Sequence, residues 1–229
     1  TVIQNSLKLA YMLGEVKEYS ANKIKRPKAK EKEVSCFTLS EQKRIECAVL
    51  SGKKPKLFGI VLCLYTGLRI GELLALEWSD IDFNKGTITV NKTCRDGTVN
   101  GVRSKIIDTP KTESSRRCVP ISSALLPILR EMKKKSKCEY VIADGEKPVF
   151  TRSYQRAFEL LLIKLKIPHK CFHSLRHTFA TRALECGMDV KSLSEILGHK
   201  NATITLNRYA HSLLEHKQDM MNRLGKLLQ

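Results

Sequence analysis

The sequence predicts an α+β protein, a mostly helical domain with one small antiparallel sheet of three strands. Apolar residues recur at helical spacing through most of the chain, whereas β-branched residues gather between residues 86 and 121 with turn signals among them. A chain of 229 residues is long enough to bury one sizeable core and to carry a small second piece. We therefore expect one main domain with a short N-terminal extension.

The N-terminal extension divides into a helix and a linker. Residues 1–21 place Ile3 and Leu7 at helical spacing. Residues 22–34 are charged and basic and show no periodicity, which is typical of a solvated linker. Because the sequence begins without an initiator Met, we interpret residues 1–21 as the tail of a preceding, truncated domain, and residues 35–229 as the main domain.

The main domain opens with a capped helix. Thr38 and Glu41 have the spacing of a capping box, and the segment that follows carries Ile45 on its apolar face. A second helix, apolar on most sides and hence buried, is expected from about Pro55 until Gly67 breaks it. Further helices are expected from about residue 69 and at 122–137, 151–165, 174–186, 189–197, 201–208 and 212–228.

The predicted sheet lies in the middle of the chain. Residues 86–94, 102–108 and 114–121 are rich in β-branched side chains. Asp-Gly, Asn-Gly and Pro-Lys-Thr separate them, and such pairs are typical of turns. We expect these three segments to pair as one antiparallel sheet.

The composition narrows the classes of partner. Forty-one Lys and Arg against 23 Asp and Glu give a formal charge of +18. Such an excess favours binding to nucleic acid over the alternative of a merely solvated basic surface, because neutralised phosphates release condensed counterions. The eight cysteines are scattered singly, without zinc-finger or disulfide spacing, which is typical of a reducing compartment. The sequence shows no signal peptide and no apolar run long enough for a membrane, so we expect an intracellular, cytoplasmic protein with no membrane partner.

Residues 171–212 gather side chains suited to phosphate chemistry, among them His173, Arg176, His199 and Tyr209. Guanidinium groups bind the oxygens of a phosphate, imidazoles move protons, and a phenol can attack once it is deprotonated. We therefore interpret this stretch as an active site that breaks DNA backbones.

Arg69 follows the buried helix, where its charge needs either a structural partner or a ligand. The structural partner would be Glu72, three residues further along one helical face. With Arg176 as a second guanidinium, the pair could instead clamp one phosphate and neutralise the charge that develops in the transition state.

Tyr209 is the tyrosine nearest this group in sequence. A phenol with a pKa of about 10 is a poor nucleophile until a base takes its proton, and His173 or His199 could do so. The alternative is an amphipathic interface residue with a satisfied hydroxyl.

His173 and His177 stand four residues apart, a spacing that also occurs at zinc sites. The glutamate of the H-E-x-x-H motif is missing, because Ser174 follows His173. We therefore interpret His177 as a supporting histidine on the apolar side of its helix, near Phe179, and we predict no metal site.

Five motifs in order carry a resemblance to a known family. They are TGLRIGELLAL at 66–76, Pro110-Lys111-Thr112, HSLRHTFAT at 173–181, LGH at 197–199 and NRYAH at 207–211. Each is weak alone, but the ordered set over residues 35–215 resembles the tyrosine recombinases, the phage-type integrases. Residues 1–21 resemble the end of that family's core-binding domain.

The resemblance implies a role for each matching residue. Arg69 and Arg176 match the two arginines that clamp the phosphate, and Tyr209 matches the nucleophile. Lys111, on the hairpin between the second and third predicted strands, matches the lysine that protonates the departing 5′ oxygen. Lys105 lies close enough in sequence to compete for that assignment, since hairpin registers slip easily.

Three further residues match supporting positions of the family. His173 matches the acid–base histidine, and His199 matches the residue that hydrogen-bonds the scissile phosphate. Glu72 matches an acidic position that supports the site from beneath.

The implied function is site-specific recombination that integrates or excises a mobile element through a 3′-phosphotyrosyl intermediate, without metal or nucleotide cofactor. The implied partners are double-stranded DNA with specific recombination sites and further copies of the chain. The copies would form a tetramer through the C-terminal helix, and an accessory DNA-bending protein is left open. Two alternatives stay open: a type IB topoisomerase, which would use the same chemistry, and a helix-turn-helix regulator built on residues 189–208.

Overall fold

The computed structural model describes residues 2–18, 35–52, 54–108, 116–145, 147–199, 201–203, 205–206, 221–222 and 224–226. The chain forms two compact units, Thr1–Glu33 and Val34–Gln229. The first unit contains helix α1 (Val2–Met12), none of whose residues is buried. Its apolar side chains are largely exposed, as at Val2 and Met12.

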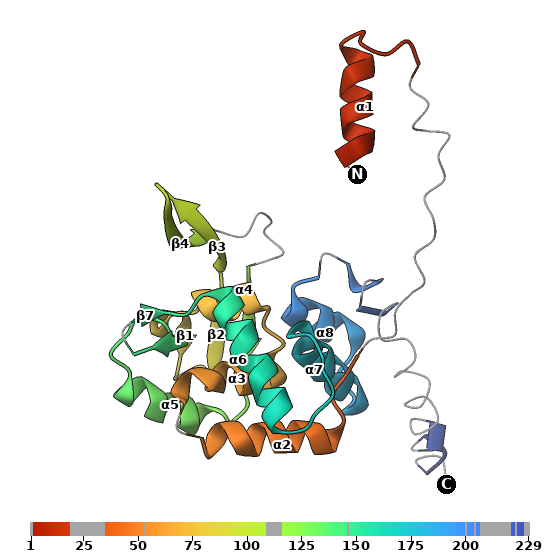
Figure 1. The fold of residues 1–229 in the computed structure, drawn as a ribbon. Helices are drawn as coiled ribbons and strands as arrows, with labels where there is room; N and C mark the ends of the chain where they lie inside the picture. Colours follow the sequence, from red (N-terminus) through yellow and green to blue (C-terminus); the bar gives the residue numbers. More distant parts are fainter. Residues whose placement is uncertain are drawn as a thin grey trace. The chain divides into compact units, whose positions relative to one another are not determined.

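The second unit is mainly helical and contains small sheets, so the predicted α+β class is confirmed. Its helical elements are α2 (Leu39–Leu50), η2 (Pro55–Leu57), α3 (Phe58–Thr66), α4 (Ile70–Ala75), η3 (Trp78–Asp80), α5 (Leu126–Lys135), α6 (Thr151–Lys164), α7 (His173–Glu185) and α8 (Val190–Leu197). Helix α3 lies at the centre, against α2 and α7 (Figure 1). All of its residues except Tyr65 are buried, and Ile60 and Leu62 are fully covered, which explains why the helix is apolar on most sides.

The predicted start and stop signals of the first two helices are confirmed. Thr38 Oγ1 accepts a hydrogen bond from the Glu41 backbone amide at 3.2 Å, and Glu41 Oε2 accepts one from the Thr38 amide at 2.8 Å. This is the capping box at the start of α2. Gly67 ends α3 in the left-handed conformation at φ +66°, where a Cβ would also lie 2.5 Å from the Phe179 ring.

The three-stranded sheet is present, but the predicted strand pairing was wrong. The structure pairs β1 (Ile81–Asp82), β2 (Thr87–Val90) and β5 (Arg117–Pro120) in the order β1-β2-β5. Strands β3 (Thr93–Val99) and β4 (Val102–Asp108) form a separate hairpin that projects from the domain (Figure 1). The predicted strand 86–94 is therefore divided between two sheets, and β5 pairs with β2 because both bury alternate side chains in the main core.

The remaining predictions differ mainly in their bounds. Helix α5 is shorter than the predicted 122–137, since Pro127 stands in its first turn and Ser136 ends it. A two-stranded pair, β6 (Ala143–Asp144) and β7 (Lys147–Pro148), was not predicted. Of the predicted helices 201–208 and 212–228, the described residues 202–203, 205–206, 221–222 and 224–226 are helical, and the other residues of these segments lie outside the described part.

Candidate active site

Three arginines converge on the C-terminal end of α8. Arg117 Nε donates to the Ile196 carbonyl at 2.5 Å, Arg176 Nη2 to the Leu197 carbonyl at 2.5 Å, and Arg69 Nη2 to the Gly198 carbonyl at 3.2 Å. The last carbonyls of a helix have no partner within the helix and carry partial negative charge. Successive carbonyls of one helix end therefore hold guanidinium groups from three different parts of the chain.

The cap at the C-terminal end of α8 leaves its last carbonyls available to the arginines. Gly198 caps the helix in the left-handed conformation at φ +64°, and its amide and that of His199 bond back to Glu195 and Ser194. Those bonds satisfy the carbonyls of residues 194 and 195 and leave the next carbonyls to the arginines. The LGH motif is thus a helix end that gathers positive charge.

Arg69 forms the predicted pair with Glu72. Its Nη1 donates to Glu72 Oε1 at 2.8 Å, and its backbone amide donates to Oε2 at 2.8 Å. Of the Arg69 side chain 38% remains exposed, compared with 7% for Glu72. The structural and the ligand-binding interpretations of Arg69 are therefore compatible, since one edge of the guanidinium is anchored and part of the side chain faces solvent.

The Glu72 carboxylate is ionised at neutral pH. Burial opposes its ionisation, but the hydrogen bonds and charge of Arg117 and the charge and backbone amide of Arg69 outweigh burial and lower its pKa from 4.5 to about 2. Glu72 contacts Arg69 and Arg117 together. The resemblance implied that Glu72 supports the site, and these contacts are compatible with that role.

Arg176 is buried, with 2% of the residue exposed. Its Nη1 donates to the Gly67 carbonyl at 2.7 Å, so the guanidinium joins the end of α3 to the end of α8. Its Nη2 lies 3.0 Å from His199 Nε2, and His199 Nδ1 lies 2.7 Å from Thr205 Oγ1. Arg69, Arg176 and His199 are thus brought together around one helix end.

His173 and His177 lie on the first turns of α7, three residues before Arg176 and directly after it. Their rings meet edge to face, with centroids 4.6 Å apart. His173 is exposed and His177 is half-buried. Among the described residues, no group of three or more His, Cys, Asp or Glu side chains is arranged to hold a metal ion.

Two predicted site residues lie outside the described part of the chain. They are Lys111, between β4 and β5, and Tyr209, after α8. Strands β4 and β5 lie in different sheets, so the predicted hairpin between the second and third strands was wrong. The competing Lys105 is described: its ammonium group donates to the Leu74 carbonyl and lies 4.1 Å from the centre of the Tyr140 ring. Burial lowers the pKa of Lys105. Its ammonium group is therefore engaged by a backbone carbonyl of α4 and by an aromatic ring.

Sequence reasoning missed Arg117 and Thr205. Arg117 lies on β5, where it alternates with the exposed Cys118 and shares a strand face with the buried Val119. A charged residue on the inward face of a buried strand needs a partner, and that pattern was the available signal. Thr205 had no comparable signal.

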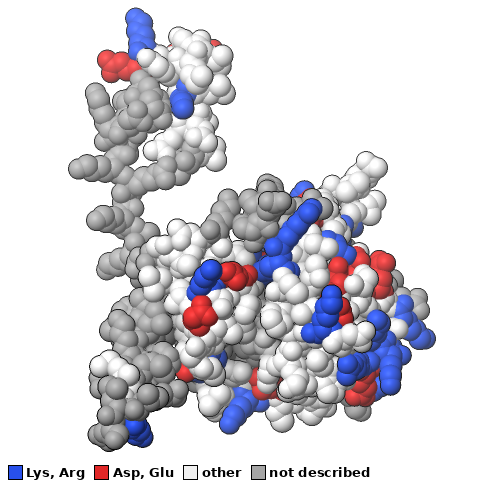
Figure 2. Space-filling view, turned by 180° about the vertical axis from the view of Figure 1, so that it is seen from behind, with Lys and Arg blue, Asp and Glu red and all other residues white. Residues whose placement is uncertain are grey.

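Basic side chains also gather on the surface of the second unit. Figure 2 shows Lys and Arg concentrated toward one side of this view, with acidic side chains among them. The last turn of α5 carries three basic residues, Lys133, Lys134 and Lys135, at a position where the helix dipole favours cations.

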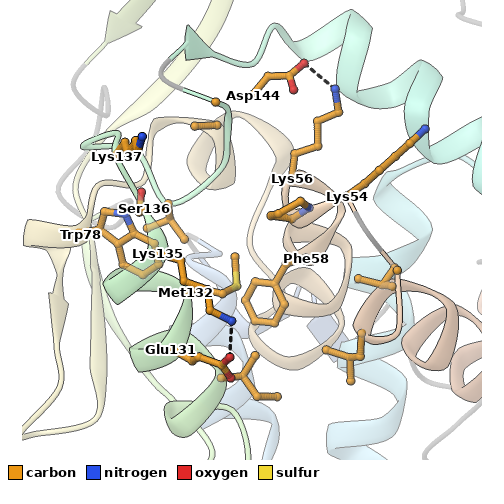
Figure 3. Close-up of a pocket in the computed structure, with 18 residues that line it drawn as sticks. Lys54, Lys56, Phe58, Trp78, Glu131, Met132, Lys135, Ser136, Lys137 and Asp144 are labelled. Atoms are coloured by element: carbon orange, nitrogen blue, oxygen red, sulfur yellow. Dashed lines mark hydrogen bonds and ion pairs between the residues drawn. The ribbon is translucent and has the colours of Figure 1, made fainter.

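A separate cavity of about 800 Å³ lies beside α2, η2 and α5. Phe58, Trp78 and Met132 give it apolar walls, and Lys56, paired with Asp144 at 2.6 Å, stands at its edge (Figure 3). None of the predicted site residues that the structure describes lines it. We therefore assign the chemistry to the arginine cluster.

Two guanidinium groups and an imidazole lie around the end of α8, and groups of these kinds can bind phosphate oxygens. Residues 39–216 match the model of the Phage integrase family, and the chain belongs to this family. The resemblance seen in the sequence motifs is confirmed. No helix in the described part of the chain is both long and apolar enough to cross a membrane.

Individual relatives agree with this assignment. The chain is 35% identical over 218 residues to a "Tyrosine recombinase XerC-like" protein of Caldanaerobacter subterraneus, covering 86% of this chain and 55% of that protein. It is 33% identical over 184 residues to the "Transposase from transposon Tn916" of Enterococcus faecalis, covering 73% of this chain and 45% of that protein. The chain thus spans about half the length of the curated relatives it matches.

A solved structure of the Tn1549 transposon integrase in complex with a circular intermediate DNA shares the fold. It superposes with a TM-score of 0.78 and 26% identity, over 96% of this chain and 77% of that one.

Proposed function

We propose that the protein is a site-specific DNA recombinase that integrates or excises a mobile element by cutting and rejoining DNA strands through a tyrosine. The observation that carries this proposal is the convergence of Arg69, Arg176 and His199 at the end of α8. Membership of the phage integrase family and the similarity to transposon integrases support it.

In the first step, the Tyr209 oxygen attacks a backbone phosphorus and the bond from phosphorus to the 5′ oxygen breaks. His173 takes the phenolic proton, and Lys111 gives a proton to the departing 5′ oxygen. Arg69 and Arg176 bind the non-bridging oxygens and neutralise the charge that develops on them, while His199 hydrogen-bonds the same phosphate. The products are a 3′-phosphotyrosyl link and a free 5′ hydroxyl.

In the second step, the 5′ hydroxyl of another strand attacks the phosphotyrosyl phosphorus. The attacking hydroxyl gives its proton to Lys111, the bond to Tyr209 breaks, the phenol regains its proton from His173, and the DNA backbone is restored. The energy of the phosphodiester is kept in the covalent intermediate, so the step balances without nucleotide hydrolysis. Side chains alone supply the transition-state charge, and no metal or cofactor takes part.

The partners of this chemistry are double-stranded DNA with recombination sites and further copies of the chain. Met221 and Leu224 belong to the apolar stripe predicted for the C-terminal segment, and 62% and 48% of these residues are exposed. Exposed apolar residues on a helical segment support docking into a neighbouring copy, and the family resemblance implies a tetramer. The exposed apolar residues of α1 support packing of residues 1–21 within a preceding domain. Action on a bacterial element would place the protein in the cytoplasm, at the nucleoid, with a DNA-bending protein as a candidate accessory partner.

The alternatives predict different products. A type IB topoisomerase would reseal the same strand and relax supercoiled DNA without site preference. A helix-turn-helix regulator would use α8 for binding and form no covalent link. The placement of Arg69, Arg117 and Arg176 on the carbonyls of α8 favours an enzyme, since a regulator has no use for that cluster.

The test is a trapped covalent adduct. The protein is incubated with a pool of nicked duplexes that carry a randomised crossover region, and the products are separated by denaturing electrophoresis. A recombinase yields an adduct whose recovered DNA shows a sequence preference, and paired sites then exchange strands. An adduct without sequence preference would favour the topoisomerase, and the absence of any adduct would contradict the proposal.

A further inference from the structure

Arg117 is a buried guanidinium that sequence reasoning did not connect with the site. Only 5% of its side chain is exposed. Its Nη1 and Nη2 donate to the two oxygens of Glu72 at 2.9 and 2.8 Å, and its Nε donates to the Ile196 carbonyl at 2.5 Å. One side chain from β5 thus bonds to α4 and to α8 at once.

The Nη1 and Nη2 atoms of Arg117 connect it to Arg69 through Glu72. Each oxygen of the Glu72 carboxylate accepts one bond from Arg117 and one from Arg69. A bidentate pair fixes the plane of the carboxylate, and that plane in turn fixes the direction of the Arg69 guanidinium. Without Arg117, the carboxylate would keep only its two bonds from Arg69 and would be held less firmly beneath that guanidinium.

The Nε atom of Arg117 connects it to His199 through the end of α8. Besides its bond to Ile196, Arg117 packs against the turn at Gly198, where an added Cβ would lie 3.1 Å from Arg117 Cδ and Nη1. His199 follows directly, so the turn that presents its ring rests on the Arg117 side chain. Gly198 is required both for its left-handed backbone and for this close approach.

From this geometry we infer that Arg117 is a positioning residue of the strand-transfer reaction. It fixes the positions of Arg69 and His199 relative to each other. The inference rests on the proposed function. Arg117 acts through Glu72 and the α8 carbonyl, whereas Arg69 and His199 meet the phosphate. Its contribution should therefore depend on the charge of the phosphate that these groups bind.

The experiment compares two suicide duplexes that differ at the scissile position, one with a phosphodiester and one with a methylphosphonate. The methylphosphonate replaces a charged oxygen with a methyl group. Its cleavage therefore depends less on a guanidinium at the position of Arg69 to neutralise charge. Adduct formation is measured in single turnover at saturating protein, for the full chain, Arg117→Lys and Arg117→Met. Arg116→Lys and Arg116→Met, at the exposed neighbouring position, serve as matched controls.

On the phosphodiester, both Arg117 variants should be slower by about 10- to 100-fold, the usual cost of losing a residue that orients a binding group. On the methylphosphonate, they should react within about threefold of wild type, because the lost interaction acts on charge. The Arg116 variants should match wild type on both duplexes.

A buried arginine can also be needed for folding, so a double variant separates the two roles. Glu72→Gln with Arg117→Met removes both buried charges together, which is far less destabilising than removing one. It should unfold close to the wild-type temperature and still be slow only on the phosphodiester. Equal slowing on both duplexes, or full activity of the folded variants on the phosphodiester, would overturn the inference. Wild-type protein that forms no adduct on either duplex would instead contradict the proposed function.

Discussion

The guanidinium of Arg176 donates a hydrogen bond to the imidazole of His199, with Nη2 lying 3.0 Å from Nε2. A guanidinium has no acceptor, so the ring nitrogen supplies the lone pair. The other ring nitrogen then carries the proton and donates to Thr205 Oγ1 at 2.7 Å. Arg176 and His199 thus hold each other in place in the absence of DNA. Because both ring nitrogens of His199 are engaged, its proposed hydrogen bond to the phosphate requires one of these two contacts to be exchanged when DNA binds.

This arrangement makes Arg176→Lys a severe change. A lysine keeps the charge but cannot hold the Gly67 and Leu197 carbonyls and His199 together, because it lacks the planar fork. We expect adduct formation to fall by about two orders of magnitude or more, with little change in DNA affinity, measured by single-turnover cleavage and by titration of labelled DNA. Arg156→Lys, in an exposed pair with Glu159, should behave as wild type. Equal losses in affinity and cleavage would make Arg176 a structural residue.

The lowered pKa of Glu72 gives a signature in stability. A carboxyl group whose folded pKa lies near 2 rather than 4.5 stabilises the protein above pH 4.5, and that stabilisation is lost as the pH falls toward 2. At neutral pH, Glu72→Gln should cost about 3 kcal/mol or more of unfolding free energy, because Arg117 stays buried without its partner. Denaturant unfolding from pH 7 to pH 2 should show the difference from wild type shrinking only below about pH 4.5. Glu159→Gln, in an exposed ion pair with Arg156, is the control and should change the unfolding free energy little at neutral pH. A difference for Glu72→Gln that stays constant from pH 7 to pH 2 would contradict the assignment.

Local signals in the sequence predicted local structure well. The capping box at Thr38, the stop at Gly67 and the pair of Arg69 with Glu72 each involve residues within four positions of one another, and each is confirmed. The structure brings Arg69, Arg176 and His199 close together at the end of α8, while their shared role in a site stays a prediction that rests on the family resemblance.

Long-range relationships could not be predicted from the residues alone. The pairing of β2 with β5 passes over the whole β3–β4 hairpin, and nothing in the turn signals distinguishes it from pairing of adjacent strands. Arg117 is placed by that pairing, so its contact with Glu72 was equally hidden. The roles of Lys111 and Tyr209 stay predictions, since both residues lie outside the described part of the chain.

The proposed chemistry should not depend on metal. Adduct formation by the wild-type protein should continue at the same rate in excess EDTA, because Arg69, Arg176 and Lys111 supply the charge that a cation would otherwise provide. The rate is compared with that of an untreated sample. Loss of activity in EDTA that added zinc restores would point instead to a metal at His173 and His177.

The C-terminal segment should assemble the complex on DNA. Deleting residues 213–229 removes the predicted apolar stripe, and we expect it to abolish the ordered multimer on a recombination site, measured by sedimentation. The double variant Met221→Ser, Leu224→Ser should weaken the multimer, because both residues are exposed apolar positions. Asn222→Ser is the matched control. A truncated protein that still forms the same multimer would show that the segment packs on its own domain.

The most direct test of the account is to identify the residue that carries the DNA. The wild-type adduct is digested with protease and nuclease, and the nucleotide-bearing peptide is sequenced by mass spectrometry. The account predicts a phosphodiester link on Tyr209, and it predicts that Tyr209→Phe binds the same DNA but gives no adduct. A link on any other residue, or an adduct that persists in Tyr209→Phe, would contradict it.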